Sequence, residues 1–161
     1  MRTHREADID ALRAIARVSH TDTRFYADLR FPRDRCDDLY DTWIDRSCQG
    51  WAQTVLVPDV AGRAQGYVTV HVDDARSRGS IGLIAVAEEA RGRGVGAALV
   101  RGAVAWCHAH ELNTVSVVTQ GRNIGAQRVF QQCGFRTSKV EFWFHKWYAE
   151  EEPGTFAGSR R

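Results

Sequence analysis

The chain has 161 residues, of which 43% are hydrophobic and 26% are charged, and its net charge at pH 7 is +2. A chain of this length and balance is typical of one globular domain, since it is too short for two hydrophobic cores of ordinary size. No apolar run approaches the roughly 20 residues of a membrane helix, and no apolar stretch follows the basic start. We therefore expect no membrane partner and no secretory leader, and we place the protein in the cytoplasm.

The cysteines and the basic residues exclude three further classes of protein. The four cysteines are widely spaced and form no C-x-x-C pair: Cys36, Cys48, Cys107 and Cys133. This spacing argues against a secreted disulfide framework and against a structural zinc site, so we predict no bound metal. The basic residues are scattered and nearly all are arginines, without the dense run that favours nucleic-acid binding. We expect no nucleic-acid partner.

The first fifty residues predict two helices joined by a loop. Residues 6–18 place Ile9, Leu12 and Ile15 on one face, with the period of an amphipathic helix. Residues 36–48 repeat this pattern, and Gly50 marks the end of the second helix. Residues 22–34, between the two, are polar and aromatic and predict a loop.

From residue 52 onward the patterns of strands and helices alternate. Two β-rich runs joined by the turn signal at 58–62 predict a hairpin. The predicted strands are residues 52–57, 65–72, 80–86, 114–119 and 136–147, the last as a closing strand or hairpin, and the predicted helices are residues 95–108 and 123–133. We expect one domain over residues 1–148 and a disordered tail over residues 149–161. This order predicts an α/β fold, largely antiparallel at first and parallel around a glycine-rich turn.

The glycine-rich turn lies between the strand at 80–86 and the helix at 95–108. Its sequence is Arg91-Gly92-Arg93-Gly94-Val95-Gly96. The first turn of a helix presents backbone N–H groups that lack internal partners, and its dipole favours an anion. Glycines let the backbone come close to a phosphate, and arginines add charge-assisted hydrogen bonds. The turn therefore predicts a site for a pyrophosphate, although a glycine-rich turn without a ligand has the same pattern.

Two other phosphate-binding patterns fit this turn less well. Gly92-x-Gly94-x-x-Ala97 matches the fingerprint of a dinucleotide-binding fold, in which an acidic residue after the next strand holds a ribose. Here the strand at 114–119 is followed by Gln120-Gly121-Arg122, and the acidic residue is missing. A nucleoside triphosphate loop would require a Gly-Lys-Ser or Gly-Lys-Thr step, which is missing as well.

Two segments together resemble the GNAT superfamily of N-acetyltransferases. Arg91-x-x-Gly94-x-Gly96 resembles its coenzyme A signature, and residues 123–135 resemble its later segment Asn-x-x-Ala-x-x-x-Tyr-x-x-x-Gly-Phe. The resemblance covers residues 2–147 and implies a mixed, mostly antiparallel central sheet flanked by helices, with acetyl-CoA as co-substrate. It also implies that the coenzyme contacts the following residues: Ile84, Ala85, Val86, Arg91, Gly92, Arg93, Gly94, Val95, Gly96, Asn123 and Phe130.

The resemblance implies a role for most of these residues. The backbone of residues 84–86 would pair with the pantetheine arm, the loop at 91–96 would hold the pyrophosphate, and Asn123 would hydrogen-bond the coenzyme. Phe130 departs from the family, because many members have a tyrosine there that protonates the leaving thiolate, and phenylalanine has no proton to donate. A thiol with a pKa near 8.5 is still a tolerable leaving group as the anion. We name His71 as the candidate catalytic base, because its intrinsic pKa suits that role; a solvated histidine at a strand end is the alternative.

The segments expected to form the acceptor site resemble a narrower group of N-acetyltransferases. Residues 23–44, 118–123 and 142–147 are similar to the N-acetyltransferases that act on the amino group of nucleotide-linked deoxysugars, the TDP-fucosamine type. This resemblance implies a small-molecule amine, specifically a sugar nucleotide, as acceptor. We expect an arginine of this segment (Arg24, Arg30, Arg33 or Arg35) to hold its diphosphate, and aromatic faces such as Phe25, Tyr26 or Trp43 to cover its base or sugar ring. Of these we name Arg24, Phe25 and Tyr26 as the acceptor-binding candidates, and for Trp43 a plain core position is the alternative. The alternatives are another amine (a protein N-terminus, an amino acid or an antibiotic) and a silent module that binds acyl-CoA without catalysis. A homodimer is left open.

Overall fold

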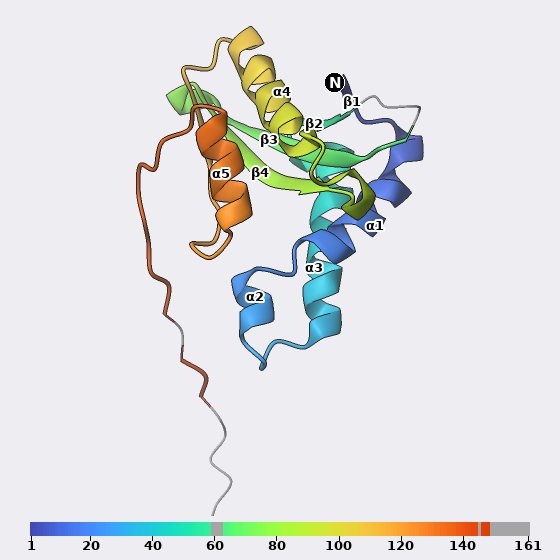
Figure 1. The fold of residues 1–161 in the computed structure, drawn as a ribbon, viewed down its shortest axis with the longest axis vertical. Helices are drawn as coiled ribbons and strands as arrows, with labels where there is room; N and C mark the ends of the chain where they lie inside the picture. The colour runs from blue at the N-terminus through green and yellow to red at the C-terminus, as the bar shows by residue number, and fades with distance from the viewer. Residues whose placement is uncertain (59–62, 145, 149–161) are drawn as a thin grey trace, which may run out of the picture.

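The computed structural model describes residues 1–58, 63–144 and 146–148, and its centre is a mixed β-sheet (Figure 1). Within these residues the sheet has five strands in the order β1-β2-β3-β4-β5. The strands are β1 (Arg2–Thr3), β2 (Thr54–Val57), β3 (Gly66–Asp73), β4 (Arg78–Val86) and β5 (Thr114–Val117). The first four strands pair with one another in antiparallel fashion, and β5 is parallel to β4. The predicted mixed, mostly antiparallel sheet is confirmed.

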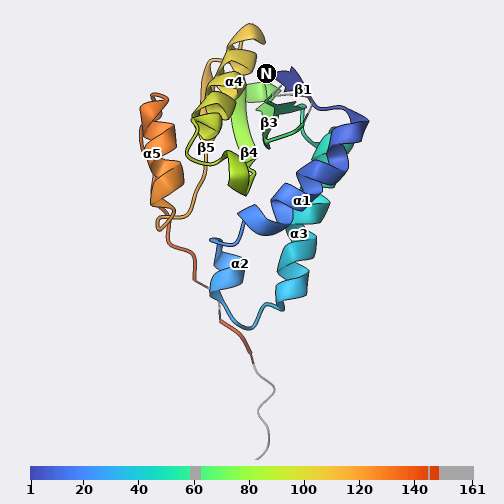
Figure 2. The ribbon, with the colours of Figure 1, turned by 45° about the vertical axis from the view of Figure 1, so that its right-hand side comes forward.

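Helices cover both faces of the sheet (Figure 2). On one side lie α1 (Ile9–Ser19) and α3 (Arg33–Arg46), and on the other side lie α4 (Val95–Ala109) and α5 (Ile124–Gln132). A short helix, α2 (Arg24–Ala27), lies below α1 in both views. Short turns of 3-10 or π geometry complete the order: η1 (Glu6–Asp8), η2 (Ser47–Trp51), η3 (Asp74–Arg76) and η4 (Glu88–Ala90). Within the described residues, no helix has the length and the apolar character needed to cross a membrane.

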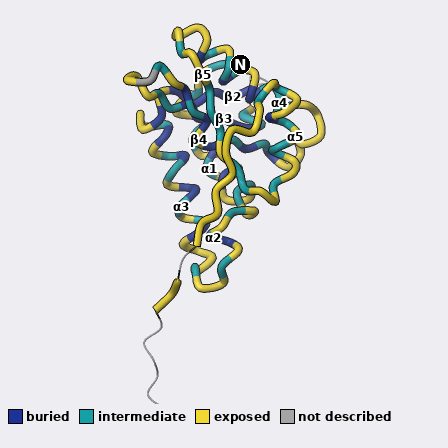
Figure 3. Tube along the Cα trace, turned by 90° about the vertical axis from the view of Figure 1, so that its left-hand side faces the viewer, coloured by how far each residue is buried: buried dark blue, intermediate teal, exposed yellow. Residues whose placement is uncertain are grey.

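The sheet separates two apolar cores. Successive side chains of a strand point to opposite faces, so Leu83 and Ala85 of β4 pack with α1 and α3, whereas Ile84 packs on the α4 side. Ile81 also packs on the α4 side, because the register of β4 against β3 shifts between residues 81 and 84. β3 is buried over its first five residues, and its neighbouring residues Tyr67 and Val68 likewise belong to opposite cores. Figure 3 shows the buried residues gathered around the strands, whereas the chain that follows α5 is mostly exposed.

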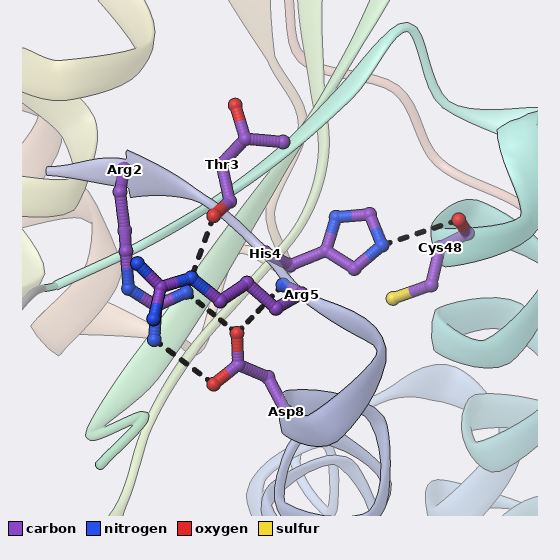
Figure 4. Close-up of polar contacts among 6 residues, drawn as sticks. All are labelled: Arg2, Thr3, His4, Arg5, Asp8 and Cys48. Atoms are coloured by element: carbon purple, nitrogen blue, oxygen red, sulfur yellow. Dashed lines mark hydrogen bonds and ion pairs between the residues drawn. The ribbon is translucent and has the colours of Figure 1, made fainter. Parts of the chain in front are cut away.

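The first eight residues are fixed by a carboxylate and a histidine (Figure 4). The Asp8 carboxylate accepts hydrogen bonds from both terminal nitrogens of Arg2, at 2.6 and 3.0 Å, and from the backbone N–H of Arg5 at 2.7 Å. The Arg2 guanidinium, supported by this N–H, lowers the pKa of Asp8 to about 2. His4 Nε2 lies 3.2 Å from the carbonyl oxygen of Cys48. These contacts hold β1 at the edge of the sheet, where two residues are too few to form a recognisable strand pattern.

Three predicted segments differ from the structure. The loop predicted at 22–34 contains α2, because Tyr26 turns inward and is buried there. α3 begins at Arg33, three residues earlier than predicted. The closing strand predicted at 136–147 is wrong: the described residues of this stretch form no strand, because no strand of the sheet pairs with them. The disordered tail predicted at 149–161 and the turn residues 59–62 lie outside the described residues.

Candidate active site

The sheet opens between β4 and β5. Their parallel pairing ends at Ile81 and Val117, the last two residues in register. β4 continues to Val86: its residues 84–86 pair with β3, and among the described residues no strand pairs with residues 82–86 on the β5 side. A free strand edge carries unpaired N–H and C=O groups that can pair with an extended, amide-containing molecule. This opening contains residues 84–86, which the family resemblance implied would meet the pantetheine arm.

A site suited to an anion follows directly after β4. Gly92 and Gly94 have φ angles of 73° and 76°, in the left-handed region, and α4 begins from Gly94. No side chain in the described part of the protein caps this helix, so its first N–H groups, from Val95 onward, stay available to a ligand. Arg91 Nε donates to the carbonyl oxygen of Val86 at 3.3 Å, which ties the loop to the end of the strand. This backbone shape suits a pyrophosphate.

An apolar cavity of about 150 Å³ lies beside the open edge of β4. It is lined by residues of β4, α4 and α5: Ile84, Val86, Gly96, Gly125, Ala126, Val129 and Phe130. Phe130 is 6% exposed and packs against Phe135, with 5.9 Å between the ring centroids. Asn123, expected to hydrogen-bond the coenzyme, caps α5, since its Oδ1 accepts from the backbone N–H of Ala126 at 3.0 Å. The structure thus gathers several of the predicted coenzyme residues around one cavity.

His71 lies at the inner end of the opening. A Cβ atom added to Gly82, the first residue after the last β4–β5 pair, would come within 2.6 Å of His71 Nε2. The imidazole therefore lies over Gly82, and only glycine leaves room for it. The ring also meets Trp51 edge-on, with 5.2 Å between centroids. Burial lowers the pKa of His71 below its ordinary value, more than a backbone contact with Trp51 raises it, so the imidazole is neutral near pH 7.

A bulge in β4 fixes this end of the opening. The register between β3 and β4 shifts between Val68 and Val70. The backbone N–H of Leu83 donates to the buried hydroxyl of Thr69 at 2.8 Å. This bond anchors the bulge to the neighbouring strand, so residue 82 cannot move away from the imidazole above it.

A ladder of four aromatic rings leads from β3 towards α2 on the α1 side of the sheet. Tyr67 and His20 share a 2.8 Å hydrogen bond through the Tyr67 hydroxyl and His20 Nε2. His20 stacks on Tyr40 at 4.6 Å between centroids, and Tyr40 stacks on Tyr26 at 6.4 Å. Burial raises the pKa of each of the three tyrosines and lowers that of His20 to about 4. All four rings of this ring ladder are therefore uncharged near pH 7.

Arg122 joins the loop before α5 to the loop after α1. Its Nε donates to Asp22 Oδ1 at 2.5 Å, and a terminal nitrogen donates to the carbonyl oxygen of Thr23 at 2.8 Å. About half of each charged side chain is exposed, so the ion pair contributes about 1 kcal/mol or less. It nevertheless links the loop next to Asn123, and with it the start of α5, to the segment that leads into α2.

A second cavity, of about 220 Å³, lies beside α2, and we call it the α2 cavity. Its lining residues are Arg24, Phe25, Phe31, Trp143 and Phe144. The Arg24 guanidinium lies 4.9 Å from the ring centroids of both Phe25 and Trp143. The structure thus brings together two of the three residues predicted to bind the acceptor. The third, Tyr26, is buried outside this lining and its hydroxyl donates to Asp37.

Comparison with known proteins identifies the family. Residues 11–135 match the Acetyltransferase (GNAT) family. The chain belongs to this family. It is 32% identical over 146 residues to the dTDP-fucosamine acetyltransferase of Escherichia coli O6:H1, a match that covers 88% of this chain and 60% of that protein. It is 24% identical over 144 residues to the spore coat polysaccharide biosynthesis protein SpsD of Bacillus subtilis, which covers 89% of this chain and 49% of that protein. The chain therefore spans about half to three fifths of the length of these curated relatives.

Solved structures share the fold. The aminoglycoside N-acetyltransferase AAC(6')-Iy in complex with CoA has a TM-score of 0.67 at 17% identity, over 90% of this chain and 92% of that chain. Ard1 from Thermoplasma volcanium has a TM-score of 0.63 at 25% identity, over 86% of this chain and 82% of that chain. Members of the GNAT family use acetyl-CoA. Among the residues that the structure describes, no group of three or more His, Cys, Asp or Glu side chains could hold a metal ion.

Proposed function

We propose that this protein is an acetyl-CoA-dependent N-acetyltransferase, and that it acetylates the amino group of a nucleotide-linked amino-deoxysugar. The observation that carries the proposal is the opening between β4 and β5, which has an anion site at one end and an imidazole at the other. The loop at 91–96 lies at the outer end, and His71 lies over Gly82 at the inner end. We expect the protein to act in the cytoplasm.

The length of the opening indicates where the thioester would lie. The pantetheine arm of coenzyme A is comparable in length to about four residues of extended chain. With the pyrophosphate on the loop at 91–96, an arm that runs back along β4 would pass Val86 and Ile84 and end near Gly82. The reacting carbonyl would then lie next to the His71 imidazole, which supports His71 as the base.

In this arrangement His71 accepts the proton that the attacking amine loses. The amine nitrogen forms a bond to the acetyl carbon, the C–S bond breaks, and its electron pair leaves with the sulfur. The proton from the nitrogen passes to His71, which burial keeps neutral near pH 7. Phe130 has no proton to give to the sulfur, so coenzyme A leaves as the thiolate, which a thiol pKa of about 8.5 permits. Proximity of amine and thioester supplies much of the rate.

Two observations favour a nucleotide-linked acceptor. The Escherichia coli relative is named as a dTDP-fucosamine acetyltransferase, and the Bacillus subtilis relative is named for polysaccharide biosynthesis. The α2 cavity sets aromatic faces beside a guanidinium, which suits a flat ring attached to a phosphate. An antibiotic amine is the alternative that the fold supports, because the similar solved structures include aminoglycoside N-acetyltransferases.

Release of free thiol from acetyl-CoA tests the proposal. The purified protein is supplied in turn with TDP-linked and UDP-linked amino sugars, an aminoglycoside, an amino acid and a peptide with a free N-terminus. We expect kcat/KM for a nucleotide-linked amino sugar to exceed that for the other amines at least about tenfold, and the mass of the product identifies the acetylated molecule. Turnover of an aminoglycoside alone would reassign the acceptor. Binding of acetyl-CoA without turnover of any amine would identify a silent acyl-CoA-binding module instead.

A further inference from the structure

The α2 cavity is built by two segments that are far apart in the sequence. Arg24, Phe25 and Phe31 belong to α2 and the loop after it, whereas Trp143 and Phe144 follow α5. We propose that this cavity binds the base and the diphosphate of a nucleoside diphosphate, with the base on the aromatic rings and the phosphates on Arg24. The inference rests on the proposed function and names the part of the acceptor that is recognised away from the reacting amine.

Aromatic faces and a free guanidinium are the groups that a base and its phosphates require. The Arg24 guanidinium lies between Phe25 and Trp143, 4.9 Å from each centroid, and it forms no ion pair with any described carboxylate. Phe25 in turn meets Phe31 edge-on at 5.5 Å. Any base has a π-face that can stack on an exposed ring such as that of Trp143. The guanidinium can bind a phosphate through paired hydrogen bonds.

The side of the α2 cavity formed by the chain after α5 is exposed to solvent, yet contacts hold this chain against α2 and its loop. Trp143 is 73% exposed and Phe144 is 93% exposed, and exposed apolar side chains that gather in one place are typical of a binding groove. Close by, Trp147 Nε1 donates to Asp28 Oδ2 at 2.6 Å, and the Trp147 ring meets Phe31 edge-on at 5.0 Å. Because these contacts hold the segment against the α2 side, a ligand has less conformational entropy to overcome when it binds.

The ring ladder connects β3 to α2, the helix that carries part of the cavity. From Tyr67 of β3, successive centroid distances of 6.3, 4.6 and 6.4 Å lead through His20 and Tyr40 to Tyr26. Tyr26 is adjacent to Phe25 in α2. The tyrosines of the ladder are buried in the core, so an acceptor whose base lies in the α2 cavity has to reach the open edge of β4 outside them. A diphosphate and a sugar ring between base and amine give the acceptor the length that such a separation requires.

Thymidine diphosphate without a sugar tests the cavity separately from acetyl transfer, because it carries no amine to acetylate. We expect it to quench the tryptophan fluorescence of the full chain, and calorimetry gives its Kd. Trp143→Ala should weaken binding at least about tenfold through the lost stacking, and Arg24→Gln should weaken it by a similar factor through the lost phosphate contact. Trp106→Phe, in α4 on the other side of the sheet, is the matched control and should keep the parental Kd.

Coenzyme A also contains a base and a diphosphate, so competition experiments decide whether the cavity binds the acceptor nucleotide or the coenzyme. Thymidine diphosphate should bind equally well when coenzyme A is saturating, and Trp143→Ala should bind coenzyme A with parental affinity. Displacement by 3′,5′-adenosine diphosphate would assign the cavity to the coenzyme and overturn the inference, as would undiminished binding by both cavity variants. If the protein acetylates an amino sugar but does not bind thymidine diphosphate, the inference fails and the proposed function stands. Binding of thymidine diphosphate without turnover of any amine supports the cavity and defeats the proposed function.

Discussion

Replacing Gly82 by alanine tests whether His71 is the base, because the two residues share one small space. The new Cβ would lie 2.6 Å from His71 Nε2 and 2.9 Å from Thr69 Oγ1, so one of these groups has to move. Thr69 is held by its 2.8 Å hydrogen bond from the N–H of Leu83. The imidazole is the end of a rotatable side chain, held by a backbone contact with Trp51 and by the edge-on contact with the Trp51 ring. We expect these contacts to yield, so that the imidazole leaves its position over β4.

The expected losses of kcat and of stability in Gly82→Ala follow from the role of His71 and from the tight packing at residue 82. A positioned base contributes a factor of about 10²–10⁴ to the rate, and we expect Gly82→Ala to lower kcat about a hundredfold. An overpacked site costs about 1–3 kcal/mol of unfolding free energy. The affinity for coenzyme A should not change, because the loop at 91–96 is not touched. Gly121→Ala is the control, since a Cβ there meets no atom within 4 Å, and it should leave both kcat and stability at parental values.

A double-mutant cycle shows whether the loss of kcat in Gly82→Ala is caused by displacement of the His71 imidazole. Thiol release at saturating acetyl-CoA gives kcat for Gly82→Ala, for His71→Ala and for the double variant. His71→Ala empties the space that the new Cβ would enter, so the double variant should have the same kcat as His71→Ala alone. Losses that multiply, or a parental kcat in Gly82→Ala, would refute the reasoning.

Three further predictions concern the loop at 91–96, the leaving group and His20. Gly94→Ala and Gly134→Ala each place a Cβ in open space, at φ angles of 76° and 88°. Each substitution should cost about 1–2 kcal/mol of unfolding free energy, because the left-handed backbone is strained for alanine. Only Gly94→Ala should also raise the calorimetric Kd for coenzyme A, at least about tenfold. Phe130→Tyr should raise kcat up to about tenfold with unchanged coenzyme affinity; a lower kcat would mean that the new hydroxyl is buried without a partner. His20 has a pKa of about 4 in the folded chain and about 6.5 when unfolded, so between these values the unfolded chain binds a proton that the folded chain excludes. Urea unfolding should therefore lose up to about 3 kcal/mol from pH 7 to pH 4, and an equally steep loss in His20→Gln would contradict the assignment.

The elements around the coenzyme site follow from local sequence. α4 begins from Gly94, as the glycine pattern predicts, because the signal for a helix start lies within a few residues of it. Asn123 accepts from the N–H of Ala126 and caps α5 for the same local reason. The helix α1, with Leu12 and Ile15 buried, could likewise be predicted from its apolar periodicity alone.

The acceptor side depends on contacts between distant segments and could not be predicted in the same way. His71 was named for its chemistry, but its position over Gly82 depends on the register of β3 and β4 and on their bulge. Trp143 lies beside Arg24 only because the chain returns to α2 after α5. The strand predicted at 136–147 failed for a related reason: a run of aromatic side chains has a high strand propensity, but a strand also needs a neighbour to pair with.

A bare strand edge also attracts other chains. Residues 82–86 have no partner strand on the β5 side of the described sheet, and natural proteins normally cover such edges because they template aggregation. A bound pantetheine arm would cover this one, so coenzyme A would protect the protein from self-association in addition to supplying the acetyl group. Coenzyme at 100 times its Kd adds about 2.7 kcal/mol to the unfolding free energy. A cell whose coenzyme pool is depleted would therefore hold this protein in its most aggregation-prone form.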